Sequence, residues 1–278
     1  MLFDIQVLKS TTFDLPVIVV GNLSTGGTGK TPQVEYLIRL LSQKCKVAVL
    51  SRGYKRKSKG FIRADANTTA ATIGDEPFQY LKKFTTVQVA VSENRCEGIE
   101  RLLQDQNPPD VIVLDDAFQH RSVSSNCNVL LTSFDALYSN DYVLPTGNLR
   151  EPRSGSKRAQ CIVVTKCPDE LTSAVREKII RSLNPKPEQQ VFFTRIAYND
   201  HVEGDGESIA VTDLPNYEIL LITGIANPNP LTDFLNENRI TLTHLKFPDH
   251  HYFTPRDMDK IKTTFDTFES NKRLILTT

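Results

Sequence analysis

Residues 17–32 read VIVVGNLSTGGTGKTP. A run of β-branched apolar residues leads into a glycine-rich loop, and the loop leads into a segment whose apolar residues recur at helical spacing. This order predicts a phosphate-binding P-loop, because glycines let backbone N–H groups turn toward an anion and a helix N-terminus adds partial positive charge. The residues expected to bind the nucleotide are Gly26, Gly27, Thr28, Gly29, Lys30 and Thr31.

Two of these residues have individual roles in the expected site. Lys30 is expected to reach the β- and γ-phosphates and to act in catalysis by neutralising charge, and the Thr31 hydroxyl is expected to hold Mg²⁺. One position departs from the usual pattern, which begins with glycine where this chain has Ser24. A glycine-rich turn without phosphate chemistry is the alternative, and the GGTGKT segment between strand and helix favours the P-loop.

A second apolar run, residues 109–116, ends in Asp115 and Asp116. This pattern is typical of a Walker B strand, in which a carboxylate orders the shell of a bound Mg²⁺. We expect Asp115, Asp116 or both at the metal, and Asp116 in catalysis; the alternative is a strand followed by an acidic turn. His120 and Arg121 come next, and either face the phosphates or cap the following turn.

The nucleotide base has one clue, the segment TKCPD at residues 165–169. Guanine-binding proteins place an Asn/Thr-Lys-x-Asp motif after an apolar strand. Here Pro168 occupies the aspartate position and Asp169 comes one residue late. The departure weakens the case for GTP, so ATP is the expected nucleotide.

Short apolar runs alternate with helical patterns through the first two thirds of the chain. Nearly continuous apolar runs are typical of strands covered on both faces, and the alternation predicts an α/β fold with a mostly parallel sheet and helices on both faces. The predicted strands are residues 17–20, 47–50, 87–91, 111–114, 129–131 and 162–164, and the predicted helices are residues 33–41, 93–103 and 169–183.

A second set of strands and helices begins after residue 216. We predict strands at 219–222, 242–247 and 274–276 and helices at 230–236 and 255–269. The expected organisation is a P-loop kinase domain at 1–190, an extended β linker at 191–216, and a smaller α/β domain at 217–278. This last domain is expected to be incomplete, because the chain stops directly after an apolar strand.

Composition excludes several other classes of protein. The 278 residues carry 33 Lys plus Arg and 33 Asp plus Glu, so the basic field of a general nucleic-acid binder is missing. The five cysteines have no CxxC spacing, which argues against a disulfide framework or a zinc site. No apolar run reaches the ~18 residues of a membrane span, and residues 1–16 lack the features of a signal peptide.

Three loops carry polar residues that suit a ligand-facing rim, although a solvated surface loop is the alternative for each. Residues 51–57 read SRGYKRK, residues 74–77 read GDEP, and residues 141–152 read DYVLPTGNLREP. Residues 247–252 read FPDHHY. Adjacent histidines in extended chain point to opposite sides, so one histidine in acid/base chemistry, or a turn that precedes a helix, fits better than a metal site.

These motifs together resemble the tetraacyldisaccharide 4′-kinases, the lipid A 4′-kinases. The segments that carry the resemblance are GNLSTGGTGKTP, LSRGYKR, GDEP, LDDAFQHR, LPTGNLREP, VTKCP and FPDHHYF. The family transfers the γ-phosphate of ATP to the 4′-hydroxyl of a tetraacylated glucosamine disaccharide 1-phosphate. The resemblance implies Mg²⁺, a lipid substrate, two α/β/α domains with the active site between them, and a peripheral location on the anionic cytoplasmic face of the bacterial inner membrane.

The resemblance also assigns roles to residues. Asp75 matches the acid proposed to activate the sugar hydroxyl, and His250 matches its histidine partner, with His251 left as the other candidate. The residues that fall on positions expected near the phosphates or the disaccharide are Tyr54, Arg95, His120, Arg150 and Glu151. Both ends look shorter than in the family, which usually has a hydrophobic N-terminal helix and continues past residue 278.

Two other functions stay open. One is a P-loop ATPase that acts as a partner-binding switch; such proteins carry a signature lysine where this chain has Thr25. The other is a soluble kinase of a small metabolite. No protein partner is predicted, and a monomer is expected.

Overall fold

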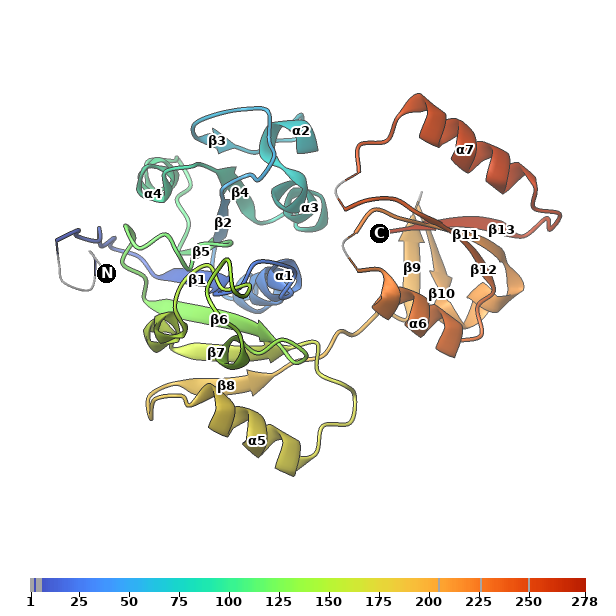
Figure 1. Cartoon of the computed structure of the whole chain (residues 1–278). Helices are drawn as coiled ribbons and strands as arrows, with labels where there is room; N and C mark the ends of the chain where they lie inside the picture. Colours follow the sequence, from blue (N-terminus) through green and yellow to red (C-terminus); the bar gives the residue numbers. More distant parts are fainter. Residues whose placement is uncertain (1–2, 4–6, 205, 226, 250) are drawn as a thin grey trace. The chain divides into compact units, whose positions relative to one another are not determined.

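The computed structural model describes residues 3, 7–204, 206–225, 227–249 and 251–278. The chain divides into two compact units at Ile196–Ala197 (Figure 1). Among the described residues, no helix has both the length and the apolar character needed to cross a membrane. All five cysteines are free thiols.

The first unit is built on an eight-stranded sheet with the order β3-β4-β2-β5-β1-β6-β7-β8, and β3 alone runs antiparallel to its neighbour. The expected mostly parallel α/β fold is confirmed. The strands are β1 Val17–Asn22, β2 Val47–Ser51, β3 Ile62–Arg63, β4 Gln88–Val91, β5 Val111–Leu114, β6 Cys127–Ser133, β7 Cys161–Thr165 and β8 Gln190–Phe193.

Helices cover both faces of this sheet because its strands are apolar on both sides. In β2, Val47 and Val49 join the cluster under α1–α3, whereas Ala48 and Leu50 join the cluster under α4 and α5. Figure 1 shows α1 and α4 on opposite sides of the strands. The helices are α1 Lys30–Leu41, α2 Ala70–Ile73, α3 Asp75–Lys83, α4 Arg95–Leu103 and α5 Ser173–Leu183, with short 3₁₀ turns η1 Tyr138–Asn140 and η2 Arg153–Arg158.

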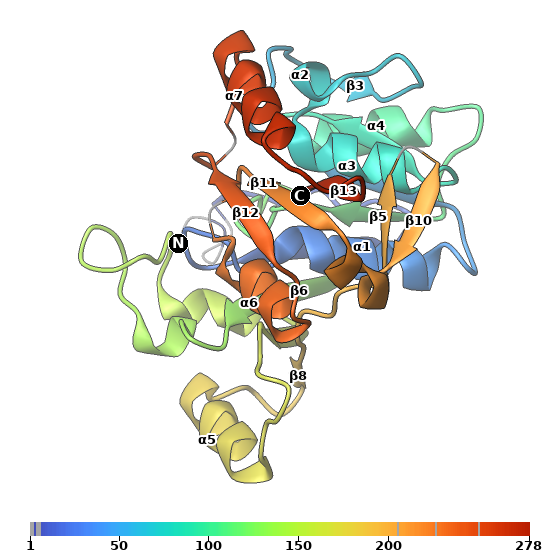
Figure 2. The same ribbon diagram turned by 90° about the vertical axis from the view of Figure 1, so that its right-hand side faces the viewer.

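The second unit is a three-stranded parallel sheet, β12-β11-β13, with α6 on one face and α7 on the other (Figures 1 and 2). A capping box of Thr254 and Asp257 closes the N-terminus of α7. The elements are the hairpin β9 His201–Gly204 and β10 Glu207–Ala210, the 3₁₀ turn η3 Val211–Asn216, then β11 Glu218–Thr223, α6 Asn229–Glu237, β12 Leu242–Lys246, α7 Pro255–Asp266 and β13 Arg273–Thr277.

The segment expected as a linker, residues 191–216, is divided between the units. Its first part belongs to β8, which pairs with β7 in the first sheet. Its later part is the β9–β10 hairpin, whose Val202 and Ile209 pack into the core that α6 covers. Val191 and Phe193 pack against the core of the first unit, and Val202 and Ile209 pack against the core of the second.

Candidate active site

The loop between β1 and α1 has the backbone conformation of an anion-binding loop. Gly26 and Gly29 have φ values of 112° and 82°, a left-handed region that favours glycine, and α1 begins directly afterwards at Lys30. The side chain of the buried Asn22 supports the loop from the end of β1, because its Nδ2 donates to Thr28 Oγ1 at 2.9 Å. Glycine geometry and the Asn22 amide therefore set the shape of the loop.

Three side chains hold carbonyl oxygens of this loop. Asn22 Nδ2 donates to the carbonyl of Gly26 at 3.4 Å. Two donors at the end of β7 reach the next two carbonyls: Lys166 Nζ lies 2.6 Å from Gly27 O, and Thr165 Oγ1 lies 2.8 Å from Thr28 O. Because these donors hold the carbonyls, backbone N–H groups of the loop are the dipoles left to meet an anion.

Sequence reasoning did not assign these three bracing residues to the loop. Two features of the sequence could have indicated them: the polar residue Asn22 directly after an apolar run, and the TK pair at 165–166 after another such run. The structure shows that Asn22 is buried. Lys166 has a φ of 57°, an uncommon value for a residue with a side chain. Its ammonium contacts the P-loop, whereas the sequence pattern had suggested a role in choosing the nucleotide base.

A second loop pairs with the start of the P-loop. Ser24 forms an antiparallel bridge with Leu149, and its neighbour Thr25 donates its N–H to Asn148 O at 2.7 Å. The Arg150 N–H donates to Leu23 O at 2.6 Å. Ser24, the position that departs from the usual motif, thus pairs with Leu149 in a short ladder.

The two aspartates after β5 have different surroundings. Asp115 is 5% exposed, and burial, together with the charges of Asp116 and Glu76, raises its pKa to about 6. Asp116 has a φ of 45° and forms ion pairs with Lys30 at 3.6 Å and with Arg150 at 3.3 Å. Asp115 is therefore the buried carboxylate, and Asp116 connects the P-loop lysine to the Arg150 loop.

Close backbone contact holds the LDDAF turn against β1. A Cβ on Gly21 would lie 2.7 Å from Phe118 Cβ and 2.9 Å from the Phe118 backbone nitrogen. Only glycine allows this approach. The contact places Asp115 and Asp116 beside the strand that leads into the P-loop.

Arg95 and His120 lie close to these aspartates. Arg95 is 1% exposed and donates to the carbonyls of Ser92 and Asp115, so the structure places its guanidinium in the interior behind Asp115. Burial, together with the charges of Arg95 and Arg52, lowers the pKa of His120 to about 4, so its imidazole is neutral at pH 7.

Glu151 has protein partners on two sides. Its Oε1 accepts hydrogen bonds from Gln119 Nε2 at 3.0 Å and from Arg158 Nη2 at 2.8 Å. Gln119 also donates to Asn22 O at 2.8 Å, which links this carboxylate to the end of β1. Both hydrogen bonds end on the same carboxylate oxygen and hold Glu151 in place, and its contact with substrate stays a prediction.

Tyr54 and Asp75 lie on two loops that pack against each other in the first unit. Gly74 has a φ of 92°, and a Cβ there would lie 2.9 Å from Tyr54 O. Asp75 is the first residue of α3, where the helix dipole favours negative charge. The Tyr54 side chain is 61% exposed. The backbone contact at Gly74 thus brings two predicted site residues to neighbouring positions.

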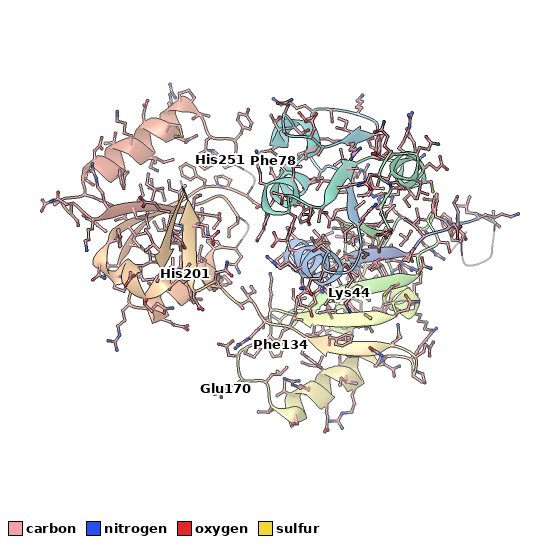
Figure 3. The ribbon with its side chains drawn as sticks, turned by 180° about the vertical axis from the view of Figure 1, so that it is seen from behind. Lys44, Phe78, Phe134, Glu170, His201 and His251 are labelled. Atoms are coloured by element: carbon pink, nitrogen blue, oxygen red, sulfur yellow. The ribbon has the colours of Figure 1, made fainter. Side chains whose placement is uncertain are left out.

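The predicted partner of Asp75, His250, lies outside the described residues. The neighbouring His251 precedes α7 in the second unit (Figure 3). Its Nε2 lies 3.0 Å from Asp257 Oδ2, and its ring stacks on Phe247 with centroids 4.9 Å apart. His251 is thus held by the turn that caps α7.

Comparison with known proteins connects these features to one enzyme family. The sequence model of the family "Tetraacyldisaccharide-1-P 4'-kinase" matches residues 1–278. The chain belongs to this family. Relatives named tetraacyldisaccharide 4′-kinase include one from Flavobacterium johnsoniae, 53% identical over all of this chain and 79% of its own length. A relative of that name from Bacteroides thetaiotaomicron is 44% identical over all of this chain and 76% of its own.

A solved structure supports the same family. The crystal structure of LpxK from Aquifex aeolicus in complex with ATP matches with a TM-score of 0.77 and 31% sequence identity. The match covers all of this chain and 81% of that one. The P-loop NTPase-like fold of this kinase family is therefore present in both chains.

Proposed function

We propose that this chain transfers the γ-phosphate of ATP to the 4′-hydroxyl of a tetraacylated glucosamine disaccharide 1-phosphate. The observation that carries the proposal is the P-loop, whose carbonyl oxygens are held by Asn22, Thr165 and Lys166. A loop braced in this way is preorganised for the phosphates of a nucleotide. Membership of the kinase family supplies the acceptor and the nucleotide.

The residues at the end of β5 fit a Mg²⁺ ion. Burial, together with the charges of Asp116 and Glu76, raises the pKa of the Asp115 carboxyl group, so a cation beside it would stabilise its charged form. Carboxylate and hydroxyl oxygens are ligands that Mg²⁺ prefers, and we assign Asp115 and Thr31 to this role, with Asp116 as a third candidate. Bound there, the ion would neutralise negative charge on the phosphates.

The chain's own residues account for the remaining parts of phosphoryl transfer. Lys30 and the loop N–H groups hold the phosphates in place and stabilise charge on them as the 4′-oxygen attacks and the bond to the leaving oxygen breaks. Asp75 is the proposed acceptor of the hydroxyl proton, and His250 is proposed to orient that carboxylate. Tyr54, His120 and Arg150 are proposed contacts of the disaccharide or its phosphates.

We further propose that the enzyme works as a monomer, bound peripherally to the anionic cytoplasmic face of the inner membrane. A lipid acceptor with four acyl chains stays in a bilayer, so the enzyme must meet it at the surface. Family membership supports this location, because each named relative takes its name from the same acylated disaccharide.

Release of ADP that depends on the acceptor tests the proposed function. Wild-type protein with ATP and Mg²⁺ should turn over with the tetraacyl disaccharide 1-phosphate and not with a panel of soluble sugars and metabolites. Lys30→Ala should lower this turnover by orders of magnitude while the protein stays folded, because the lysine neutralises charge in the transition state. Turnover on a soluble metabolite, or full activity of the folded variant, would overturn the assignment.

A double-mutant cycle tests the proposed acid/base pair. Asp75→Ala and His250→Ala should each lower kcat strongly, and the double variant should lose little more than the worse single variant, because groups that act as a unit are not additive. If Asp75 only stabilises the N-terminus of α3, its loss should instead appear in thermal melts and add to that of His250.

A further inference from the structure

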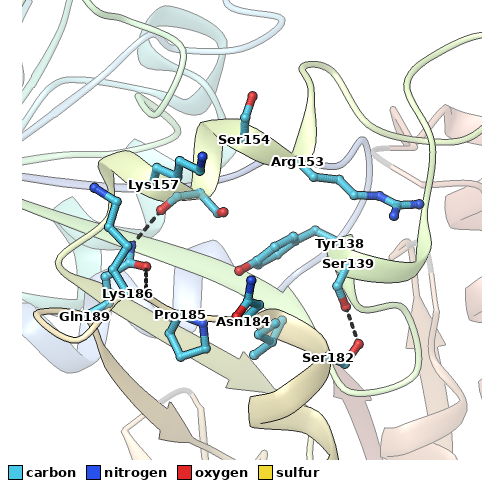
Figure 4. A pocket seen from close by; sticks show the side chains of 12 residues that line it. Tyr138, Ser139, Arg153, Ser154, Lys157, Ser182, Asn184, Pro185, Lys186 and Gln189 are labelled. Atoms are coloured by element: carbon cyan, nitrogen blue, oxygen red, sulfur yellow. Dashed lines mark hydrogen bonds between the residues drawn. The ribbon is translucent and has the colours of Figure 1, made fainter.

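A pocket of about 530 Å³ opens in the first unit among η1, η2, the end of α5 and the segment before β8 (Figure 4). Its lining residues lie between 138 and 189, and the P-loop, Asp115 and Asp116 contribute none of them. The proposed phosphoryl transfer therefore leaves this pocket unused.

The lining of this pocket is cationic. Arg153, Lys157 and Lys186 contribute three positive charges, and none of the described lining residues carries a carboxylate. Serine hydroxyls lie between the cations, and Ser139 and Ser182 are hydrogen bonded to each other at 2.7 Å across the pocket edge (Figure 4). Lys186 has one acidic neighbour, Glu188 at 3.4 Å, which lies outside the lining. Clustered cations with hydroxyl donors favour an anion that accepts several hydrogen bonds, such as a phosphate.

A buried tyrosine hydroxyl lies among the polar groups of the pocket. Tyr138 is 2% exposed, and its phenol interacts with the Ser156 hydroxyl, which lines the same pocket. Burial raises the pKa of this phenol, so it keeps its proton and remains a donor at pH 7. Figure 4 shows the hydroxyl among the labelled side chains of the pocket. An acceptor bound in the pocket can therefore hydrogen bond to the phenol as well as to the serine hydroxyls.

An exposed apolar tip lies next to the pocket in the chain. Tyr142, Val143 and Leu144 are 63%, 39% and 52% exposed. Two hydrogen bonds close the base of the loop: the Leu149 N–H donates to Tyr142 O at 2.9 Å, and the Leu144 N–H donates to Leu149 O at 3.0 Å. A yellow-green loop projects from the first unit in Figure 2. Hydrogen bonds across the base of the loop therefore present these apolar side chains to the outside.

Arg153 connects the tip to the pocket. Its guanidinium lies 4.8 Å from the centre of the Tyr142 ring, its Nε donates to Asp141 O at 2.7 Å, and its side chain lines the pocket. A cationic pocket beside an exposed aromatic and two aliphatic side chains matches the surface of an anionic bilayer. There, phosphates lie at the head-group level, and tyrosine sits at the boundary with the acyl chains.

We propose that this pocket binds the phosphate of an anionic phospholipid head group while the Tyr142–Leu144 tip enters the same leaflet. The proposal rests on the proposed function, to which it adds the residues that hold the enzyme at the membrane. Lys157 and Lys186 bind the head-group phosphate, Arg153 joins them, and the tip buries apolar surface in the interface. The ligand class is a phospholipid with a net negative charge.

Flotation with lipid vesicles tests the proposal. The probes are vesicles of phosphatidylethanolamine alone and vesicles of phosphatidylethanolamine with phosphatidylglycerol. The Lys157→Gln/Lys186→Gln double variant should bind the anionic vesicles roughly 30-fold more weakly than wild type, which is two lysines at about 1 kcal/mol each. The matched control is Lys44→Gln/Lys262→Gln, which removes the same charge from exposed lysines outside the pocket and should change binding less than about threefold. Equal losses in the two double variants would overturn the proposal.

Two further arms separate the source of the phosphate and the role of the tip. Tyr142→Ser/Leu144→Ser should weaken binding to both kinds of vesicle, because it removes apolar area and no charge. Inorganic phosphate can bind the P-loop, so it should shift the thermal melts of wild type and of the Lys157→Gln/Lys186→Gln variant equally. A stabilisation by phosphate that depends on Lys157 and Lys186, without any effect of these lysines on flotation, would show a free-phosphate site and overturn the lipid assignment.

Activity on a detergent-dispersed acceptor separates this proposal from the proposed function. The Lys157→Gln/Lys186→Gln variant should keep wild-type turnover there, because neither lysine lies among the residues placed at the P-loop or the aspartates. If wild-type protein floats with anionic vesicles but has no kinase activity, the proposed function is wrong and the proposed lipid site stands. If the enzyme is active and the Lys157→Gln/Lys186→Gln variant binds anionic vesicles as strongly as wild type, the proposed lipid site is wrong and the proposed function stands.

Discussion

Replacing Thr165 with valine should loosen the P-loop without changing the shape of the side chain. Thr165 is 5% exposed, and its hydroxyl donates to Thr28 O at 2.8 Å, with Thr132 O at 3.3 Å as a second acceptor. Valine keeps the branched outline and removes the donor. A buried carbonyl left without its partner costs about 2 kcal/mol, within a usual range of about 1–3 kcal/mol.

Two measurements follow from this free energy. For a domain of this size, about 1 kcal/mol corresponds to about 2–4 °C, so Thr165→Val should lower the melting temperature by about 4–8 °C. The Thr28 carbonyl would then be free to turn toward the phosphates. If about 1 kcal/mol of preorganisation is lost, the affinity for ATP should fall about fivefold, as measured by isothermal titration calorimetry.

The matched control is Thr194→Val, which removes the same hydroxyl at the end of β8. Its Oγ1 lies 3.5 Å from Val164 O, a poor hydrogen bond, and does not contact the P-loop. The control should therefore melt close to wild type and bind ATP normally. Wild-type melting and ATP affinity in Thr165→Val, or equal losses in both variants, would refute the role given to this hydroxyl.

Three further predictions concern the aspartates, His120 and Gly21. Asp115→Asn or Asp116→Asn should shift the Mg²⁺ titration of turnover more than nucleotide affinity; an unchanged titration in both variants would remove these residues from the metal site. The pKa of His120 is lowered to about 4 in the folded protein, so between about pH 6.5 and 4 the unfolded chain binds a proton at this residue and the folded protein does not. The contribution of His120 to the unfolding free energy is therefore present above about pH 6.5 and should be lost as the pH falls toward 4. The difference in unfolding free energy between wild type and His120→Gln, followed by denaturant titration, should shrink over that range, and a constant difference would contradict it. Gly21→Ala should be destabilising by about 1–3 kcal/mol in a thermal melt, because its Cβ would lie 2.9 Å from the Phe118 backbone nitrogen; a wild-type melt would show that this turn can move.

The central strands and helices of both units were predictable because their patterns are local. Val17–Asn22 is a nearly continuous apolar run that can only be buried on both faces, and the glycines after it indicate the loop. The contacts of Thr165 and Lys166 were not predictable, because they join residues 137 and 139 positions apart in the chain. The order of strands in the sheet brings these residues together, and local patterns do not specify that order.

The same limit applies to the boundary between the units and to Glu151. Residues 191–216 read as an extended segment, but their apolar side chains divide between two cores that the sequence does not distinguish. Glu151 was expected near the phosphates or the disaccharide because the family resemblance places it there. Its Oε1 accepts hydrogen bonds from Gln119 and Arg158, and these partners are known only once the loops are folded.

The bridge between Ser24 and Leu149 makes one polypeptide segment a participant in two binding equilibria. One end of residues 142–150 is the apolar tip, and the other end is hydrogen bonded to the strand that becomes the P-loop. Thermodynamic reciprocity then requires one coupling factor for both directions. By whatever factor vesicles change the dissociation constant for ATP, ATP must change the partition of the enzyme onto vesicles by the same factor. If this segment does not couple the two sites, vesicles leave the dissociation constant for ATP unchanged, and ATP leaves the partition onto vesicles unchanged.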